Sequence, residues 1–275
     1  MWNLFVFWDL FFEIYRLCTV NNINAMTNQY LIEICAANIQ SALAAEEGGA
    51  SRIELVDNLF EGGTTPSYAA IKTAVELLTI DIMVMIRPRG SDFCYSDLEF
   101  EMMKKDILLC RELDVKGVVF GLLNSDGTVD TRRTRQLVEY ARPLEVTFHR
   151  AFDVTPDPFD ALEAIISCGV DRILTAGQQN TVPDGLELLV KVIQQAGDRI
   201  RIMPGSGIHE ENIRSIRDAT GANEFHLTAR APVESVMTFR KKNIFMGGLP
   251  EIPEYKIFIS NAERIRKIVT LVNHG

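Results

Sequence analysis

Polar side chains stand at the ends of several apolar, strand-like runs of the sequence. The clearest run is VTFHRAFD, residues 146–153, in which His149, Arg150 and Asp153 follow a short apolar segment. Because residues i and i+2 share a face of a strand, Thr147 and His149 point one way and Arg150 points the other. A histidine facing into a barrel is a candidate acid or base. The alternative is a buried histidine that a neighbouring carboxylate satisfies.

Other strand-like runs end in the same way. Glu33 and Cys35 share one face of the first run, Glu54 and Val56 repeat that spacing on the second, Arg87 and Arg89 follow the third, and His226 and Arg230 lie on or after the last. Acids, imidazoles and guanidinium groups at one mouth would perturb one another's pKa values, which is how acid and base roles are assigned. Glu33, Glu54 and His149 are therefore candidate catalytic residues. The alternative is an internal salt-bridge layer that seals the barrel, because a buried charge needs a partner whatever its purpose.

A glycine-containing loop is a second candidate site. Gly205 and Gly207 lie in PGSGI after the seventh strand-like run, and Arg230 follows the eighth. Glycine lets backbone N–H groups approach an anion, and the next helix adds its positive end. The ligand-binding candidates are thus Arg87, Arg89, Arg150, Asp153, Gly205, Gly207, His226 and Arg230. The alternative for the loop is a tight turn between a strand and a helix.

The elements that must position these residues alternate regularly. Strands are predicted at residues 31–35, 52–56, 82–86, 116–120, 144–148, 172–175, 199–203 and 224–228, with helical patterns between them. Such alternation of apolar strands and helices predicts a single closed (β/α)₈ barrel, with its active face at the carboxyl ends of the strands. A doubly wound sheet is the second choice, but no G-x-G-x-x-G follows the first strand. Residues 231–260 break the rhythm and are predicted to form an ordered loop before a last helix at 262–272.

Several helix starts are also readable from the sequence. Proline at a first turn places helix starts at Thr65–Pro66 and at Thr155–Pro156. The S-x-x-E pattern of Ser96 and Glu99 predicts a capping box. Ser260 and Asn261 are predicted to cap the last helix.

Charge and cysteine content restrict the partners. The chain of 275 residues has 28 Lys and Arg against 37 Asp and Glu, a net charge of -9 that repels nucleic acid and anionic membranes. Any anion site must therefore be local. Five cysteines with no C-x-x-C spacing indicate neither a disulfide framework nor a zinc cluster, which favours a reducing cytosol.

Residues 1–30 are predicted to be an extension, either disordered or a docking helix, ahead of a barrel domain at residues 31–275. The apolar stretch near the start carries Asp9, Glu13 and Arg16, so it is a poor signal peptide, and it is too short to span a bilayer. The repeating strand–helix pattern begins only after it, so residues 1–25 are predicted to be dispensable for folding.

The sequence resembles the CutC copper-homeostasis family. The resemblance rests on the runs EICAANIQSALAAEEGGASRIEL, LFEGGTTPS, VMIRPRGSDFCYS, VTFHRAFD, RILTAG, IRIMPGSGI, EFHLTAR and SVMTFR, and it covers the chain from about Leu31 to Met246. It implies a barrel protein of the cytosol and nucleus that forms homo-oligomers and binds Cu(I). The family's copper ligands are cysteines at the ends of the first two strands; Cys35 matches the first position, and Val56 occupies the second.

Two hypotheses follow. In the first, the protein binds Cu(I) through Cys35 and contributes to copper tolerance or distribution. In the second, it is an enzyme that acts on a small anionic or sugar-like substrate at the carboxyl ends of the strands. Glu33, Glu54 and His149 would then supply acid and base groups, and Arg87, Arg150 and Arg230 would clamp the anion.

Overall fold

The computed structural model describes residues 29–241, 243–246 and 252–274. The predicted extension at residues 1–30 therefore lies outside the described residues, except for its last two. Their backbone N–H groups donate to Asn273 Oδ1 near the end of the last helix, at 3.0 Å from Gln29 and 3.3 Å from Tyr30.

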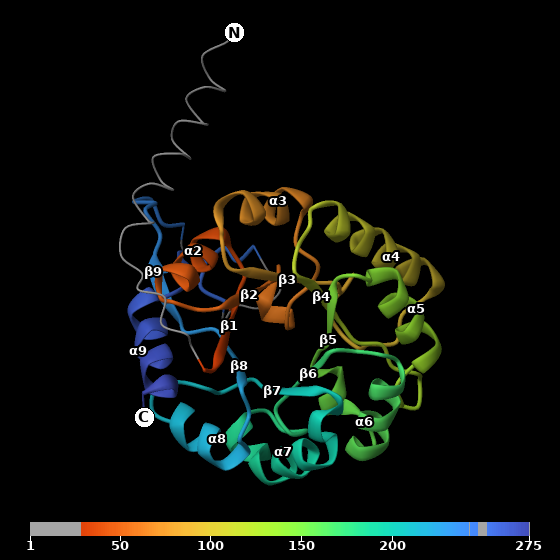
Figure 1. Cartoon of the computed structure of the whole chain (residues 1–275). Coiled ribbons are helices and arrows are strands. Elements are labelled where there is room, and N and C mark those ends of the chain that lie inside the picture. The colour runs from red at the N-terminus through yellow and green to blue at the C-terminus, as the bar shows by residue number, and fades with distance from the viewer. Residues whose placement is uncertain (1–28, 242, 247–251, 275) are drawn as a thin grey trace.

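Eight parallel strands form the predicted barrel (Figure 1). They are β1 (Leu31–Ala36), β2 (Arg52–Leu55), β3 (Asp81–Met85), β4 (Gly117–Phe120), β5 (Glu145–Phe148), β6 (Arg172–Thr175), β7 (Arg201–Pro204) and β8 (Glu224–Leu227). From β1 to β7 each strand pairs with the next along the chain, and β8 returns to pair with β1. Between β7 and β8 the ring is joined by one parallel bridge, Gly205 to His226. A Cβ at residue 205 would lie 2.4 Å from Leu174 Cδ1 and 3.0 Å from His226 Cβ, so this contact needs a glycine.

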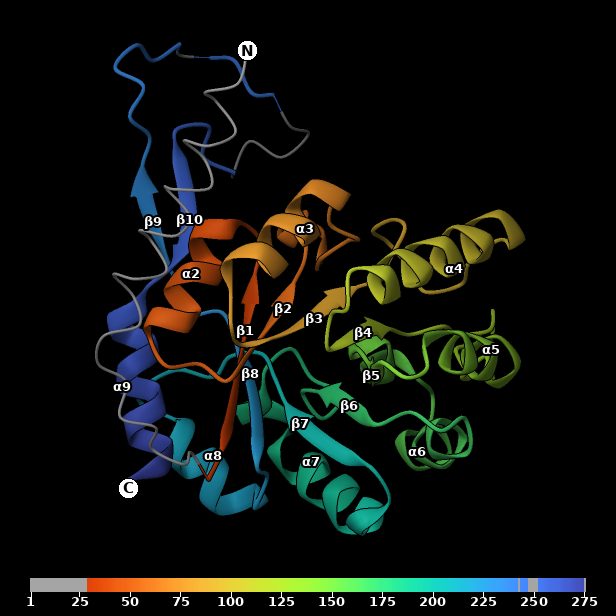
Figure 2. The same cartoon turned by 45° about the horizontal axis from the view of Figure 1, so that its top comes forward.

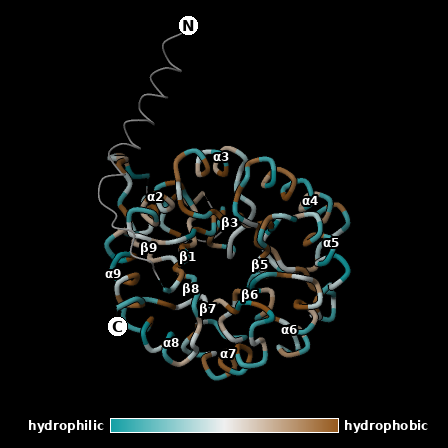
Figure 3. The backbone as a smooth tube through the Cα atoms, viewed as in Figure 1, coloured by the Kyte–Doolittle hydropathy of each residue, from teal (hydrophilic) through white to brown (hydrophobic). Residues whose placement is uncertain are grey.

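Helices surround the strands in a ring. They are α2 (Ile39–Glu47), α3 (Tyr68–Leu77), α4 (Asp97–Glu112), α5 (Thr131–Ala141), α6 (Pro158–Ser167), α7 (Val182–Ala196), α8 (Ile213–Thr220) and α9 (Ala262–Asn273). Short 3₁₀ segments lie at η1 (Leu59–Glu61), η2 (Arg150–Val154) and η3 (Gly197–Arg199). Hydrophobic and hydrophilic residues alternate along the outer helices (Figure 3), as expected where one helix face packs on the strands. No helix in the described ranges is long and apolar enough to cross a membrane.

Two of the predicted helix starts are wrong by a few residues, and one is confirmed. Helix α3 starts after Ser67, whose side chain accepts from Ala70 N, and α6 starts after Asp157, whose side chain accepts from two backbone N–H groups. In both cases a polar cap just beyond the proline satisfies the free N–H groups of the first turn. The capping box of Ser96 and Glu99 is present at the start of α4.

The predicted loop at residues 231–260 is in part a β-hairpin. Strands β9 (Arg230–Glu234) and β10 (Lys256–Ser260) pair antiparallel, and Figure 2 shows them rising beside α2. The backbone N–H of Ser260 donates to Ser41 Oγ at 3.0 Å, and Asn38 Nδ2 donates to Phe258 O at 3.1 Å. These bonds tie the hairpin to α2. Of the two residues predicted to cap the last helix, Asn261 does so, through a bond from Arg264 N.

Candidate functional site

A layer of buried ion pairs fills the amino-terminal end of the barrel. Arg172 and Arg52 are 0% and 2% exposed, and both bind the carboxylate of Glu224. Arg172 also pairs with Glu145 at 3.1 Å and donates to Thr147 Oγ1 at 3.1 Å. A salt-bridge layer therefore exists, but it lies at the end opposite the predicted site, and among the described residues Glu33 is the one strand-end candidate that takes part in its ion pairs with arginine.

Glu33 belongs to this layer and does not line the mouth where it was predicted. One carboxylate oxygen binds Arg52 Nε, and the other lies 2.8 Å from His226 Nδ1. The physical reason is depth, because Glu33 lies two residues before Cys35 on the same strand. At about 3.3 Å per residue, its Cα lies about 6.6 Å further back along the strand.

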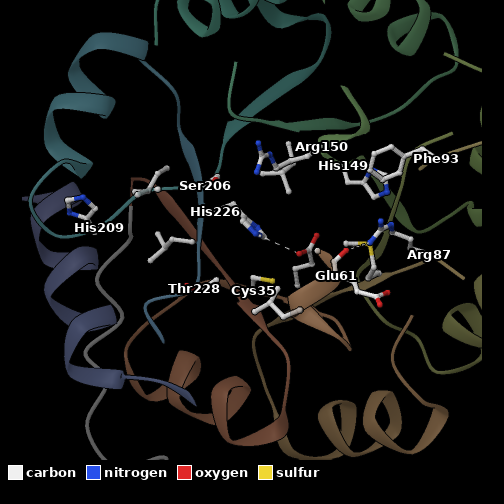
Figure 4. Close-up of a pocket in the computed structure, with 18 residues that line it drawn as sticks. Cys35, Glu61, Arg87, Phe93, His149, Arg150, Ser206, His209, His226 and Thr228 are labelled. Atoms are coloured by element: carbon white, nitrogen blue, oxygen red, sulfur yellow. Dashed lines mark hydrogen bonds and ion pairs between the residues drawn. The ribbon is translucent and has the colours of Figure 1, made fainter. Parts of the chain in front are cut away.

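A pocket of about 490 Å³ opens at the carboxyl ends of the strands (Figure 4). Its lining includes seven of the predicted strand-end residues: Cys35, Glu54, Arg87, His149, Arg150, Gly207 and His226. They come from β1, β2, β8 and the segments after β3, β5 and β7. The prediction that polar strand ends share one mouth therefore holds for these residues.

Cys35, Glu54 and His226 form a buried cluster inside this pocket. One potential ligand atom from each residue, a sulfur, an oxygen and a nitrogen, lies within 4.8 Å of the other two. Strand register explains the arrangement, because Cys35 is the Cα partner of Glu54. Cys35 also packs with Val56 and Met85, among other apolar side chains.

Glu33 orients the imidazole of His226. In the neutral ring, an Nδ1–H that donates to the Glu33 carboxylate leaves the lone pair on Nε2. That atom lies 3.7 Å from Glu54 Oε2. A carboxylate behind a ligating histidine fixes its tautomer in this way in many metal sites. Glu33 is thus a positioning residue for this cluster.

The cluster's protonation states depend on one another. Burial alone would raise the pKa of Glu33, but Arg52 and the hydrogen bond from His226 hold it well below its usual range. Burial would likewise lower the pKa of His226, but the charges of Glu54 and Glu33 raise it above its ordinary value. For Glu54, burial raises the pKa in spite of the His226 charge. Burial and the neighbouring Glu54 also raise the pKa of the Cys35 thiol.

His149 lines another side of the pocket, where its imidazole is buried and neutral. It is buried and lies beside Phe93, with ring centroids 4.9 Å apart. Burial and the charge of Arg87 lower the pKa of His149 to about 3. Its Nδ1 accepts a bond from Ala151 N at 3.1 Å. At neutral pH the ring therefore presents an N–H donor at Nε2 and no lone pair, which argues against a role as general base.

Four predicted ligand-binding residues lie outside the pocket lining. Arg89 pairs with Glu99 at 2.6 Å and with Asp92 at 3.1 Å, on the loop before α4. Arg230 stacks on Phe258 and Phe60, at 5.2 Å and 5.9 Å from the ring centroids. Asp153 and Gly205 are structural residues of the loops: Asp153 accepts a bond from Gln178 N, and Gly205 leaves room for Leu174 and His226.

Asp153 holds the loop after β6 in place. Its carboxylate accepts bonds from the backbone N–H groups of Ala176 and Gln178, both at 3.0 Å. It also binds Arg150 Nε at 2.6 Å. Arg150, which does line the pocket, donates its Nη2 to Gln179 O at 2.7 Å. These two residues therefore fix the pocket's rim.

Sequence reasoning missed several lining residues. Glu61, Phe93 and His209 border the pocket without having been singled out (Figure 4). Ser206 of the predicted glycine-containing loop and Thr228 at the end of the predicted eighth strand also line it. Glu61 ends the short η1 segment, and Phe93 and His209 lie on loops, where no strand alternation reveals the direction of a side chain. The signal that could have found His209 was its place just after the Gly205–Gly207 loop.

The chain matches known proteins over most of its length. The family model of the CutC family matches residues 30–231. A CutC family protein from Parabacteroides distasonis is 50% identical over 240 residues, which cover 87% of this chain and 99% of that protein. The human copper homeostasis protein cutC homolog is 43% identical over 241 residues, which cover 88% of each chain.

Solved structures agree with the fold. A crystal structure of CutC from Streptococcus agalactiae has a TM-score of 0.69 and 38% identity, and the match covers 72% of this chain and 98% of that one. Phosphoribosylanthranilate isomerase from Thermotoga maritima has a TM-score of 0.53 at 14% identity, covering 88% of this chain and 98% of that one, which shows the fold alone. The barrel, the strand-end motifs and these matches agree, and the chain belongs to the CutC family.

Proposed function

We propose that the protein binds one Cu(I) ion per chain in the pocket, with Cys35 and His226 as ligands, and so contributes to copper tolerance or distribution. The observation that carries this proposal is the buried cluster of Cys35, Glu54 and His226, whose potential ligand atoms lie within 4.8 Å of one another. The name of the human relative, a copper homeostasis protein cutC homolog, supports the choice of metal.

The donor atoms suit copper to different degrees. Cu(I) is a soft ion that prefers thiolate and thioether sulfur, and imidazole also binds copper. Cys35 supplies a thiolate and His226 supplies an imidazole. The thioether of Met85 lies in the same apolar group as Cys35 and lines the pocket, so it is the candidate third ligand. The Glu54 carboxylate is a hard donor, and we assign it the role of accepting the proton that metal binding displaces.

Affinity should be limited by this chemistry. Val56 occupies the position of the second family cysteine and cannot coordinate a metal. The Cys35 thiol must lose its proton on binding, although burial and Glu54 raise its pKa. We therefore expect a modest affinity for Cu(I). This affinity should increase as the pH rises, because the Cys35 thiol releases its proton more easily at higher pH.

The test is a competition titration against a Cu(I) chelator under reducing conditions. Wild type should bind one equivalent, and Cys35→Ser should lose it. Cys94 is an exposed thiol that could take up Cu(I) independently, so the matched control is Cys94→Ser, which should bind as wild type does. Equal binding by wild type and Cys35→Ser would refute the proposal.

Location and assembly are parts of the same proposal. We place the protein in the cytosol and in the nucleus, and the four described cysteines, all free thiols, are compatible with a reducing compartment. We also propose a homo-oligomer, which light scattering on the purified protein would test. The enzyme alternative has weaker support, because the isomerase match rests on fold likeness at 14% identity.

A further inference from the structure

One wall of the pocket carries a hydrogen-bond donor that the copper proposal does not use. His149 Nδ1 accepts a bond from Ala151 N at 3.1 Å, so the neutral ring carries its proton on Nε2. Nε2 is buried and has no hydrogen-bond partner among the described residues. His149 lines the pocket. A buried donor without a partner is costly, which points to a ligand that accepts this bond.

The surrounding residues hold the ring in this orientation. The ring of Phe93 lies against it, with centroids 4.9 Å apart. On another side, a Cβ at residue 121 would lie 2.6 Å from His149 Nδ1, so the ring occupies space left by Gly121. A flipped ring would lose the bond from Ala151. The Nε2–H direction is therefore built into the fold.

Arg87 adds a fixed positive charge on the same side of the pocket, close enough to lower the pKa of His149 (Figure 4). Its Nη1 donates to the carbonyl oxygens of Glu61 and Gly63, at 2.7 Å and 2.8 Å, and its Nη2 donates to Ser91 O at 2.8 Å. Its guanidinium carbon lies 5.1 Å from the centroid of Phe93. Within the described chain this buried guanidinium pairs with no carboxylate. A buried charge with no counter-ion favours binding of an anion nearby.

We propose that the Arg87–His149 end of the pocket binds the carboxylate of a small organic acid, with the His149 Nε2–H as the directed donor and Arg87 as the compensating charge. A single directed N–H beside one cation suits a carboxylate better than a phosphate, which usually meets several N–H groups at a helix end. The apolar lining by Phe93, Leu59 and Leu174 suits the carbon skeleton of such an acid. This ligand site does not depend on copper.

The test uses the metal-free full chain with ¹⁵N-labelled histidine. The His149 Nε2–H resonance is followed by NMR during titration with acetate, malonate and inorganic phosphate, and thermal unfolding is measured in parallel. We expect a saturable shift of this resonance with a carboxylate probe, together with a higher melting temperature, since a ligand of the folded state stabilises it. His149→Phe should weaken binding about tenfold or more, because a bond to a charged acceptor is lost. His149→Gln, which keeps an N–H donor, should recover part of it.

Two further variants distinguish this carboxylate site from an anion site at Arg230 and from the copper site at Cys35. Arg230→Ala should bind the carboxylate as wild type does, because Arg230 stacks on Phe258 outside the pocket lining. Cys35→Ser should also bind it normally while losing copper, so each proposal can fail without the other. The inference is overturned if no probe moves the Nε2–H resonance, if only phosphate binds, or if Arg230→Ala abolishes binding that His149→Phe retains. The resonance is observed in wild type, so a variant that fails to fold leaves the test intact.

Discussion

Cys35 and Glu54 are Cα partners across the ladder between β1 and β2, and their side chains meet in the pocket with His226. The pairing places a thiol beside a carboxyl group in the barrel interior. Burial and the Glu54 charge then keep the thiol protonated until a metal ion displaces the proton. The register of two strands therefore determines both where copper would bind and how strongly pH would affect it.

Replacing Val56 by cysteine should strengthen Cu(I) binding. Val56 packs in the same small apolar group as Cys35, so a thiol there would stand near the first one. Two thiolates suit Cu(I) better than one thiolate and an imidazole, and we expect a dissociation constant lower by about tenfold or more. Competition with a Cu(I) chelator measures the change. A Val56→Cys protein that binds no more tightly than wild type would show that the two strand ends do not share a metal.

Glu33→Gln should weaken copper binding without removing a ligand. Glu33 holds His226 Nδ1 at 2.8 Å and so directs Nε2 toward the cluster. Loss of such an orienting carboxylate typically costs about 10- to 100-fold in metal affinity. The same substitution removes the charge that pairs with buried Arg52, so the free energy of unfolding should fall by about 3 kcal/mol. Unchanged affinity in a folded Glu33→Gln protein would mean that His226 is not a ligand.

Arg172→Met should destabilise the barrel and leave copper binding alone. Arg172 is 0% exposed and pairs with Glu224 and Glu145, whose carboxylates would lose a buried partner. Removing one member of a buried ion network costs about 3–5 kcal/mol. Urea denaturation gives the stability, and the chelator titration gives the affinity. A large loss of affinity in the folded variant would contradict the separation of the salt-bridge layer from the pocket.

His149 should make the protein less stable toward acid. Its pKa is about 3 in the folded chain against 6.5 for an ordinary histidine, so the unfolded chain binds the proton first. The stabilising contribution is complete above about pH 6.5 and is lost progressively as the pH falls toward about 3. Between about pH 7.5 and about pH 5, wild type should lose about 2 kcal/mol more than His149→Gln does. Equal losses in urea denaturation at the two pH values would contradict the neutral, buried imidazole.

The sequence was sufficient for the barrel because each strand is an apolar run between helical patterns. The predicted strand at residues 172–175 coincides with β6, and the other strand boundaries differ by a residue or two. The hairpin of β9 and β10 was missed, because Pro232 interrupts its first strand and the partner lies more than twenty residues further along the chain.

The sequence predicted which side chains of the strands point into the barrel, but not how close each one lies to the pocket. Alternation along β1 shows that Glu33 and Cys35 share a face, but it does not show which of them reaches the mouth. The pairing of β1 with β2 shows which one does. Arg52 is the partner of Glu33 in the salt-bridge layer, and Glu54 is the partner of Cys35 in the pocket. Arg230 could not be placed either, because the residues it packs on, Phe60 and Phe258, are distant in the sequence.

The most direct test of the account is X-ray absorption spectroscopy of the Cu(I)-loaded protein at the copper edge. The account predicts sulfur and imidazole scattering from the same ion in the wild type. The imidazole component should disappear in His226→Gln, and stoichiometric loading should be lost in Cys35→Ser. A wild-type spectrum with sulfur ligands alone, unchanged by both substitutions, would contradict a copper site formed by Cys35 and His226.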